Sequence, residues 1–111
     1  MSSHTSDDRL RHIRSSIMYI EQFTADGEAA FRASRMIQHA VLYNLLVIGE
    51  ASRALAIEVR QQLPEVEWKR IIGLRNILTH EYYSVDLDII WGIISRRLHE
   101  LRDQIDRFLS R

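Results

Sequence analysis

The stretch from Arg75 to Tyr83 gathers the side chains of this sequence that are best suited to chemistry at a phosphate. It reads Arg-Asn-Ile-Leu-Thr-His-Glu-Tyr-Tyr and so holds a fixed cation, an amide, an imidazole and two phenols. The guanidinium of Arg75 stays charged and presents a planar fork of donors that matches phosphate oxygens. Histidine is the residue type best suited to give or take a proton near neutral pH, and His80 supplies one here. Together these side chains indicate proton transfer next to a bound phosphate.

A regular helix would keep Arg75 and His80 apart. At about 100° per residue, five residues separate the two side chains by roughly 140° around the helix axis. Either the helix ends near Thr79 and the chain turns His80 back, or two subunits combine their motifs in a shared cleft. Asn76 follows Arg75 directly and can orient the phosphate or the imidazole through hydrogen bonds.

The helix that carries Arg75 is predicted to open at residues 64–67, after Leu63-Pro64 stops the preceding helix. Arg75 falls in the middle of its apolar face. A buried guanidinium needs a carboxylate or phosphate facing it, and losing one partner of a buried pair typically costs ~3–5 kcal/mol. Glu50 is the candidate carboxylate, within the chain or across a dimer. The apolar face itself comprises Trp68, Ile71, Ile72, Leu74 and Leu78.

The preceding helix is predicted to start between residues 28 and 34 and to end near Gln62. It carries two apolar stripes, so it must be buried on two sides. A domain this small covers one side well, and we expect a partner subunit on the other, approaching closely over Gly49 and its small neighbours. The first stripe holds Ile37, Val41, Leu45, Ile48, Leu55 and Val59. The second holds Leu42, Leu46, Val47, Ala54 and Ile57.

The two ends of the chain predict one further helix each. Residues 1–6 are expected to be a flexible tail, and Asp7-Asp8 can cap a first helix that Asp26-Gly27 breaks. Asp86 can cap a last helix. The first helix has its apolar residues at Leu10, Ile13, Ile17, Ile20 and Phe23, and the last at Ile89, Ile93, Leu98, Leu101, Ile105, Phe108 and Leu109. The prediction is an all-α bundle of four to five helices, forming one domain over residues 7–111.

Composition supports this fold and narrows the classes of function. Glycine (4) and proline (1) are scarce, which favours long helices over sheets. Cysteine is absent, and the five histidines form no ligand-spaced set, so we expect no metal site and no cofactor. No apolar run approaches the ~20 residues of a membrane span, and a cytoplasmic protein is expected. The formal net charge is zero, but 14 of the 15 basic residues are arginine, which suits phosphate recognition.

The motif resembles the Arg-(x)4-His-x-Tyr motif of HEPN-domain ribonucleases, and more narrowly that of HepT-type toxins. Three further blocks resemble that family, in the expected order: residues 44–51 in the second helix, Leu63-Pro64 with Trp68, and residues 85–91. An isolated Arg-(x)4-His is a weak signal. Four blocks in order within about a hundred residues make a strong one.

The resemblance implies a homodimer with a composite cleft and an endoribonuclease that needs no metal. Arg75 and His80 would be catalytic, and Asn44, Glu50 and Asn76 supporting. HepT-type toxins are paired with an MNT-type nucleotidyltransferase antitoxin, which attaches adenylyl groups to the tyrosine of the motif. In this sequence that residue is Tyr82, and the adjacent Tyr83 is a further possible acceptor. If the helix ran on, Tyr82 would lie about 20° from Arg75 around its axis.

Two other interpretations remain open at this point. The chain could be a non-catalytic HEPN module that binds nucleotide or serves as a scaffold for the nucleotidyltransferase. It could also be a plain helical dimerisation domain. In that case Arg75 is tied to Glu50, His80 caps the helix end, and Tyr82 and Tyr83 pack in the core.

Overall fold

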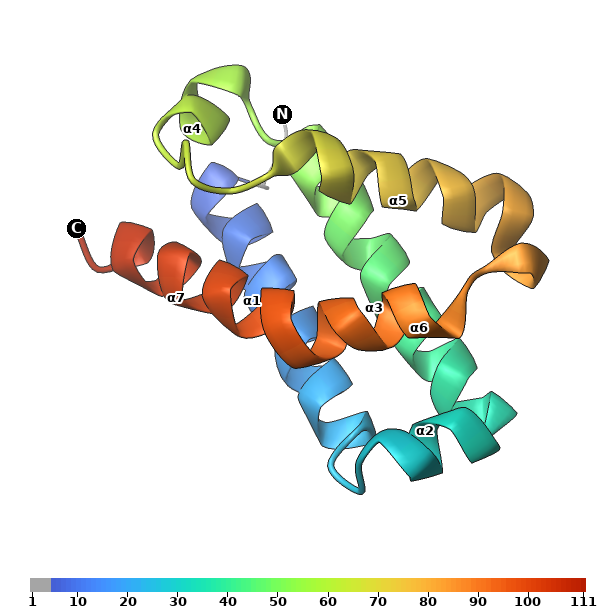
Figure 1. Cartoon of the computed structure of the whole chain (residues 1–111). Coiled ribbons are helices and arrows are strands. Elements are labelled where there is room, and N and C mark those ends of the chain that lie inside the picture. Colours follow the sequence, from blue (N-terminus) through green and yellow to red (C-terminus); the bar gives the residue numbers. More distant parts are fainter. Residues whose placement is uncertain (1–4) are drawn as a thin grey trace.

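Two antiparallel helices, α1 (Ser6–Phe23) and α3 (Arg35–Ala54), form the centre of the computed structural model, which describes residues 5–111 (Figure 1). Side chains at spacings of three and four on α1 meet one side of α3, and both sets are removed from solvent. These buried residues are Leu10, Ile13, Ile17 and Ile20 on α1 and Val41, Leu45 and Ile48 on α3. The predicted first helix is confirmed, and four of its five predicted apolar residues are buried, whereas Phe23 is 44% exposed.

A capping box begins α1. The backbone N–H of Asp8 donates to the Thr5 hydroxyl (3.1 Å), and the backbone N–H of Thr5 donates to the Asp8 carboxylate (3.4 Å). The cap is therefore Thr5 rather than the expected Asp7-Asp8, because a hydroxyl three residues before an acidic side chain can make both bonds. Ser6 is already helical. Residues 1–4 of the expected tail lie outside the described part of the chain.

The long second helix expected to reach Gln62 is broken at two points, and this prediction was wrong. Ser34 has extended backbone (φ −120°, ψ 109°) and separates α2 (Glu28–Ala33) from α3. Leu55 is also extended (ψ 141°) and leads into the short α4 (Ile57–Gln61). Leu55 is buried. The turn therefore places Leu55 in the core, and this tertiary contact outweighs a local sequence that would continue the helix.

The two apolar stripes of the second helix differ in how far a single chain covers them. The first stripe forms core, as predicted. In the second stripe, Leu42 and Leu46 are half-buried against the core, whereas Ile57 on α4 is exposed. Part of this second side is thus open to solvent in one chain.

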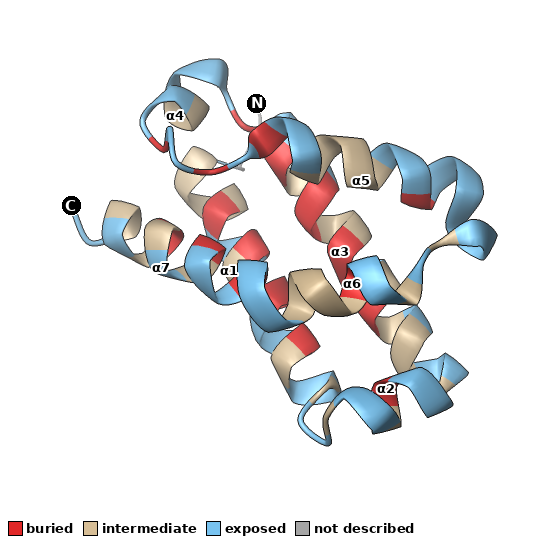
Figure 2. Ribbon diagram, in the orientation of Figure 1, coloured by how far each residue is buried: buried red, intermediate tan, exposed pale blue. Residues whose placement is uncertain are grey.

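The helix that carries the motif, α5 (Trp68–Glu81), crosses α3 (Figure 1). It is followed by a single 3-10 turn, η1 (Tyr82–Ser84). Figure 2 shows α5 buried at its start and mostly exposed toward its C-terminal end, where Leu78 is the buried exception. The motif thus lies where α5 leaves the core.

The last part of the chain is one rod made of α6 (Leu87–Gly92), a π-helical turn η2 (Ile93–Arg97) and α7 (Leu98–Leu109). Asp86 caps it, as predicted, by accepting from the backbone N–H of Asp88 (2.8 Å). The π turn adds a residue to one turn of the helix. On the N-terminal side of this turn, the buried positions are therefore shifted by one residue. Ile90 is buried there, and the predicted Ile89 is 61% exposed.

Ion pairs and an aromatic contact join the rod to the rest of the bundle. On α7, Arg102 pairs with Glu21 (2.6 Å) and Asp106 with Arg14 (3.1 Å), both on α1. On α2, Arg32 donates to Asp88 (2.5 Å), and hydrogen bonds to Asp88 and Glu28 raise the pKa of Arg32. The ring centroids of Phe31 on α2 and Trp91 on α6 lie 5.4 Å apart, so the two helices are in contact there. The contacts with α2 hold α6, and the ion pairs with α1 hold α7.

The secondary structure of residues 5–111 is helical without a strand, so the predicted all-α class is confirmed. Within that part of the chain, none of the helices has the length and apolar character needed to cross a membrane.

Candidate functional site

Arg75 lies where α5 crosses α3, and its guanidinium pairs with the carboxylate of Glu50 in the same chain. The Arg75 side chain is 19% exposed and that of Glu50 is 51% exposed. The predicted partner is thus confirmed as an intramolecular one. Because Glu50 is half-exposed, the pair lies at the edge of the core rather than inside it.

Gly49 makes this close crossing possible. A Cβ built at position 49 would overlap the Cβ of Arg75 and lie 2.9 Å from its Cγ. The sequence suggested that Gly49 admits a second subunit, but the helix it admits is α5 of its own chain. No signal in the sequence pairs position 49 with position 75.

Two further hydrogen bonds hold the Arg75 region. Arg75 Nη1 donates to Asn76 Oδ1 (3.0 Å), and the Thr79 hydroxyl donates to the backbone carbonyl of Arg75 (2.8 Å). Asn76 and Glu50 thus accept from different nitrogens of one guanidinium, which fixes the direction of its planar fork. Asn76 orients the cation itself, whereas the sequence suggested that it orients phosphate or imidazole. Thr79 was not singled out from the sequence.

His80 lies in the last turn of α5 and its side chain is exposed. The helix continues through Glu81, so the expected alternative in which it ends near Thr79 and turns His80 back is wrong. Regular helix geometry then applies, and His80 and Arg75 point about 140° apart, roughly 7.5 Å apart along the axis. One chain does not aim both side chains at one phosphate.

Tyr82 and Tyr83 form the start of η1, beyond the end of α5. Glu81 leaves helical backbone (φ −140°, ψ 36°), so the helical-wheel argument that placed Tyr82 about 20° from Arg75 fails. Tyr82 is 61% and Tyr83 78% exposed, and the two rings meet edge to face with centroids 5.8 Å apart. The interpretation in which these tyrosines are core aromatics is therefore contradicted.

The side chain of Asn44 forms its hydrogen bond within its own helix. It is buried on α3, and its amide donates to the carbonyl of Ala40 one turn earlier (2.9 Å). This bond satisfies the amide within its own helix. Glu50 and Asn76 thus contact Arg75 directly, whereas the side-chain hydrogen bond of Asn44 stays within α3.

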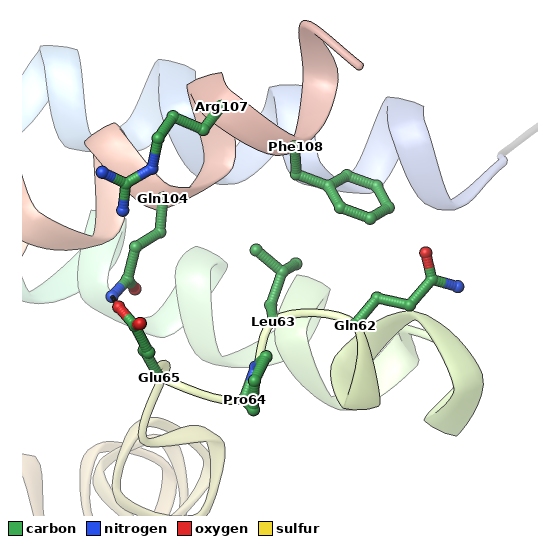
Figure 3. Close-up of a pocket in the computed structure, with 7 residues that line it drawn as sticks. All are labelled: Gln62, Leu63, Pro64, Glu65, Gln104, Arg107 and Phe108. Atoms are coloured by element: carbon green, nitrogen blue, oxygen red, sulfur yellow. Dashed lines mark hydrogen bonds between the residues drawn. The ribbon is translucent and has the colours of Figure 1, made fainter.

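Two hollows on the chain are lined by other residues. One, of about 510 Å³, runs between α5 and the rod, with Leu45 and Ile48 among its lining residues. The other, of about 460 Å³, lies between the segment before α5 and the end of α7, where Leu63, Glu65 and Phe108 face it (Figure 3). Neither is lined by Arg75, His80 or Tyr82. Over residues 5–111, no group of three His, Asp or Glu side chains is placed to hold a metal ion.

Comparison with known proteins gives one family and one fold. A profile described as Ribonuclease HepT-like matches residues 13–108. A protein of Methanocaldococcus jannaschii, described in its name as a putative RNase, is 36% identical over 86 residues, which cover 77% of this chain and 79% of that protein. A protein of Thermococcus cleftensis, named probable ribonuclease HepT, is 29% identical over 90% of this chain and 92% of its own length.

A solved structure shows a similar fold. It is a tri-AMPylated HEPN toxin of Shewanella oneidensis in complex with MNT antitoxin. The two chains superpose with a TM-score of 0.73 over 100% of each, at 24% sequence identity. At this level of identity the likeness concerns the arrangement of the helices.

Proposed function

Because the chain belongs to the Ribonuclease HepT-like family, we propose that it is a metal-independent endoribonuclease and the cytoplasmic toxin of a toxin–antitoxin pair. One observation carries the proposal. Arg75 is held at the edge of the core by Glu50 and Asn76, while His80 stands exposed on the same helix. Metal-independent RNA cleavage uses proton transfer and stabilisation of charge on the phosphate oxygens, and an exposed imidazole and a fixed guanidinium can supply these two functions.

The proposed reaction is an internal transfer at phosphorus. A base removes the proton of the ribose 2′-hydroxyl, and this oxygen forms a bond to the phosphorus. The bond from phosphorus to the 5′-oxygen of the next nucleotide breaks, and an acid protonates that leaving oxygen. His80 serves in this proton transfer, and Arg75 stabilises the charge that builds on the phosphate oxygens. The products carry a 2′,3′-cyclic phosphate and a 5′-hydroxyl.

A homodimer solves the geometric problem of the single chain. Arg75 and His80 diverge on α5, and part of the second apolar stripe is uncovered, as at Ile57. We assign the working site to a cleft between two subunits. In that cleft Arg75 of one chain acts with His80 of the partner subunit, which serves as base or acid.

Mixed dimers test the shared cleft. A dimer of one Arg75→Ala subunit and one His80→Ala subunit keeps one intact combination if the two groups act across the interface. Its RNA cleavage rate is then up to half that of the parent dimer, whereas each variant alone is inactive. A mixed dimer as inactive as the two separate variants places both groups of a site in one chain.

The antitoxin of this pair is proposed to be an MNT-type nucleotidyltransferase that AMPylates Tyr82. The partner named for the Shewanella oneidensis toxin supports this choice. The hydroxyl of Tyr82 lies on an exposed ring just past His80, so another enzyme can reach it. The phenol oxygen attacks the α-phosphate of ATP and pyrophosphate leaves. The adenylyl phosphate then puts an anion and bulk where RNA must bind.

The alternative is a non-catalytic HEPN scaffold that binds nucleotide or the nucleotidyltransferase. A scaffold has no need for Arg75, His80 and Tyr82 together, and this favours the enzyme. Incubating the purified chain with single-stranded RNA and analysing the product ends separates the two functions. New 2′,3′-cyclic phosphate ends support the enzyme. Intact RNA, together with tight binding of the nucleotidyltransferase, supports the scaffold.

A further inference from the structure

The aromatic pair on η1 is unexplained by the packing of the chain. Tyr83 is 78% and Tyr82 61% exposed, and their rings meet edge to face at an interplanar angle of 81°. The turn that carries them is held by the Ser84 hydroxyl, which donates to the carbonyl of Glu81 (3.0 Å). Two large rings kept in solvent by an ordered turn contribute little to the core.

The position of this pair indicates what it contacts. η1 begins two residues after His80, at the exposed end of α5 (Figure 2). Because the rings follow His80 so closely in the chain, an RNA with a phosphate at His80 can place a neighbouring nucleotide against them. Unpaired bases stack on exposed aromatic side chains, whereas bases inside a duplex are already stacked on each other.

We propose that Tyr83, with Tyr82 set edge-on against it, is a stacking platform for an unpaired RNA base beside the cleaved phosphate. The chain would accordingly act on single-stranded RNA and discriminate against duplex RNA. This inference rests on the proposed ribonuclease function, because it places the platform relative to His80.

The charges around η1 favour base stacking over phosphate binding at this turn. Glu81 and Asp86 flank the two tyrosines and are exposed, so this segment repels phosphates rather than attracting them. A platform here contributes through the ring of Tyr83 and not through charge. Neutral stacking releases no counterions, so its share of the affinity does not depend on salt.

Binding of a short fluorescent RNA tests the platform. The His80→Ala protein is the parent, because it is expected to hold RNA without cutting it. In this background, Tyr83→Ala is expected to weaken binding of single-stranded RNA about five- to a hundredfold, by the same factor at low and high salt. Tyr83→Phe keeps the ring and is expected to bind like its parent. Tyr19→Ala, an exposed tyrosine on α1 that is 47% exposed, is the matched control and is expected to change nothing.

The same RNA annealed to its complement provides the second arm. Its affinity is expected to be lower and to be unchanged by Tyr83→Ala. Equal weakening of single-stranded and duplex binding by Tyr83→Ala would overturn the platform. So would a Tyr83→Ala protein that binds single-stranded RNA like its parent while the unmodified chain cleaves RNA, and in that case the proposed ribonuclease function would stand.

Sedimentation of each variant distinguishes RNA from a protein partner. A Tyr83→Ala chain that loses its dimer together with its RNA affinity assigns Tyr83 to a protein interface and overturns the platform. If the unmodified chain cleaves no RNA and its His80→Ala form binds none, the proposed function itself fails, and the platform fails with it.

Discussion

Gly49 and Arg75 are in direct contact where α5 crosses α3, and a side chain on Gly49 would occupy the space of the Arg75 Cβ. The residue after Gly49 is Glu50, which pairs with the Arg75 guanidinium. Two neighbouring residues of α3 therefore set both the depth and the direction of the proposed phosphate-binding cation. The position of Arg75 depends on how closely these two helices approach.

Gly49→Ala is expected to lower the free energy of unfolding by about 1–3 kcal/mol, because an added methyl group at a filled crossing forces the helices apart. RNA cleavage should fall as well, since Arg75 is displaced. The matched control is Gly73→Ala on α5, where a built Cβ meets nothing within 4 Å. The free energy of unfolding of this control is expected to rise by about 0.5–1 kcal/mol, because alanine has a higher helix propensity than glycine. Thermal unfolding of both variants measures these changes. An unchanged melting temperature for Gly49→Ala would refute the tight crossing.

The Arg75–Glu50 pair is expected to contribute about 1–2 kcal/mol to stability, measured by a double-mutant cycle with alanine at each position. This is less than the 3–5 kcal/mol of a buried pair, because the Glu50 side chain is 51% exposed and solvent screens its charge. The control cycle uses Arg70 and Glu67, a pair three residues apart with 76% and 48% exposed side chains. Its coupling should be below about 0.5 kcal/mol. Equal coupling in the two cycles would mean that the crossing does not strengthen the Arg75 pair.

The apolar periodicity predicted most of the core but not where helices end. It identified Leu10, Ile13, Ile17 and Ile20, which are all fully buried. It missed the break at Leu55, because that break places a leucine in the core and leaves no glycine or proline as a signal. It also missed the π turn, since a one-residue insertion in a helix has no local signature, and so it chose Ile89 where Ile90 is buried.

The candidate site was predictable in its residue types and less so in its geometry. The need of Arg75 for a carboxylate followed from its place on an apolar face, and Glu50 was the correct partner. The direction of the His80 side chain depended on whether α5 stops at Thr79 or runs to Glu81, a difference of less than one turn. The sequence alone did not decide that difference, and it also left open whether Tyr82 follows the helix.

Tyr82→Phe is expected to remain toxic and to escape the antitoxin, because it loses the acceptor hydroxyl but keeps the ring. Co-expression with the cognate nucleotidyltransferase, followed by intact-mass analysis, measures the adenylyl increments. Tyr83→Phe is the control and should be modified and neutralised like the parent. A full mass increment on Tyr82→Phe, or complete rescue of growth, would move the acceptor to Tyr83 or favour neutralisation by a tight complex.

His80 is proposed to take part in RNA cleavage that needs no metal, and the cleavage rate in the presence of EDTA tests this role. The measurement compares the parent chain with His80→Ala and with the control His99→Ala, an exposed histidine on α7. Both variants should fold and melt like the parent, because neither side chain is buried. We expect the parent and His99→Ala to cleave RNA equally in EDTA and His80→Ala to cleave none. Cleavage by His80→Ala at the parental rate, or loss of parental cleavage in EDTA, would contradict this proposal.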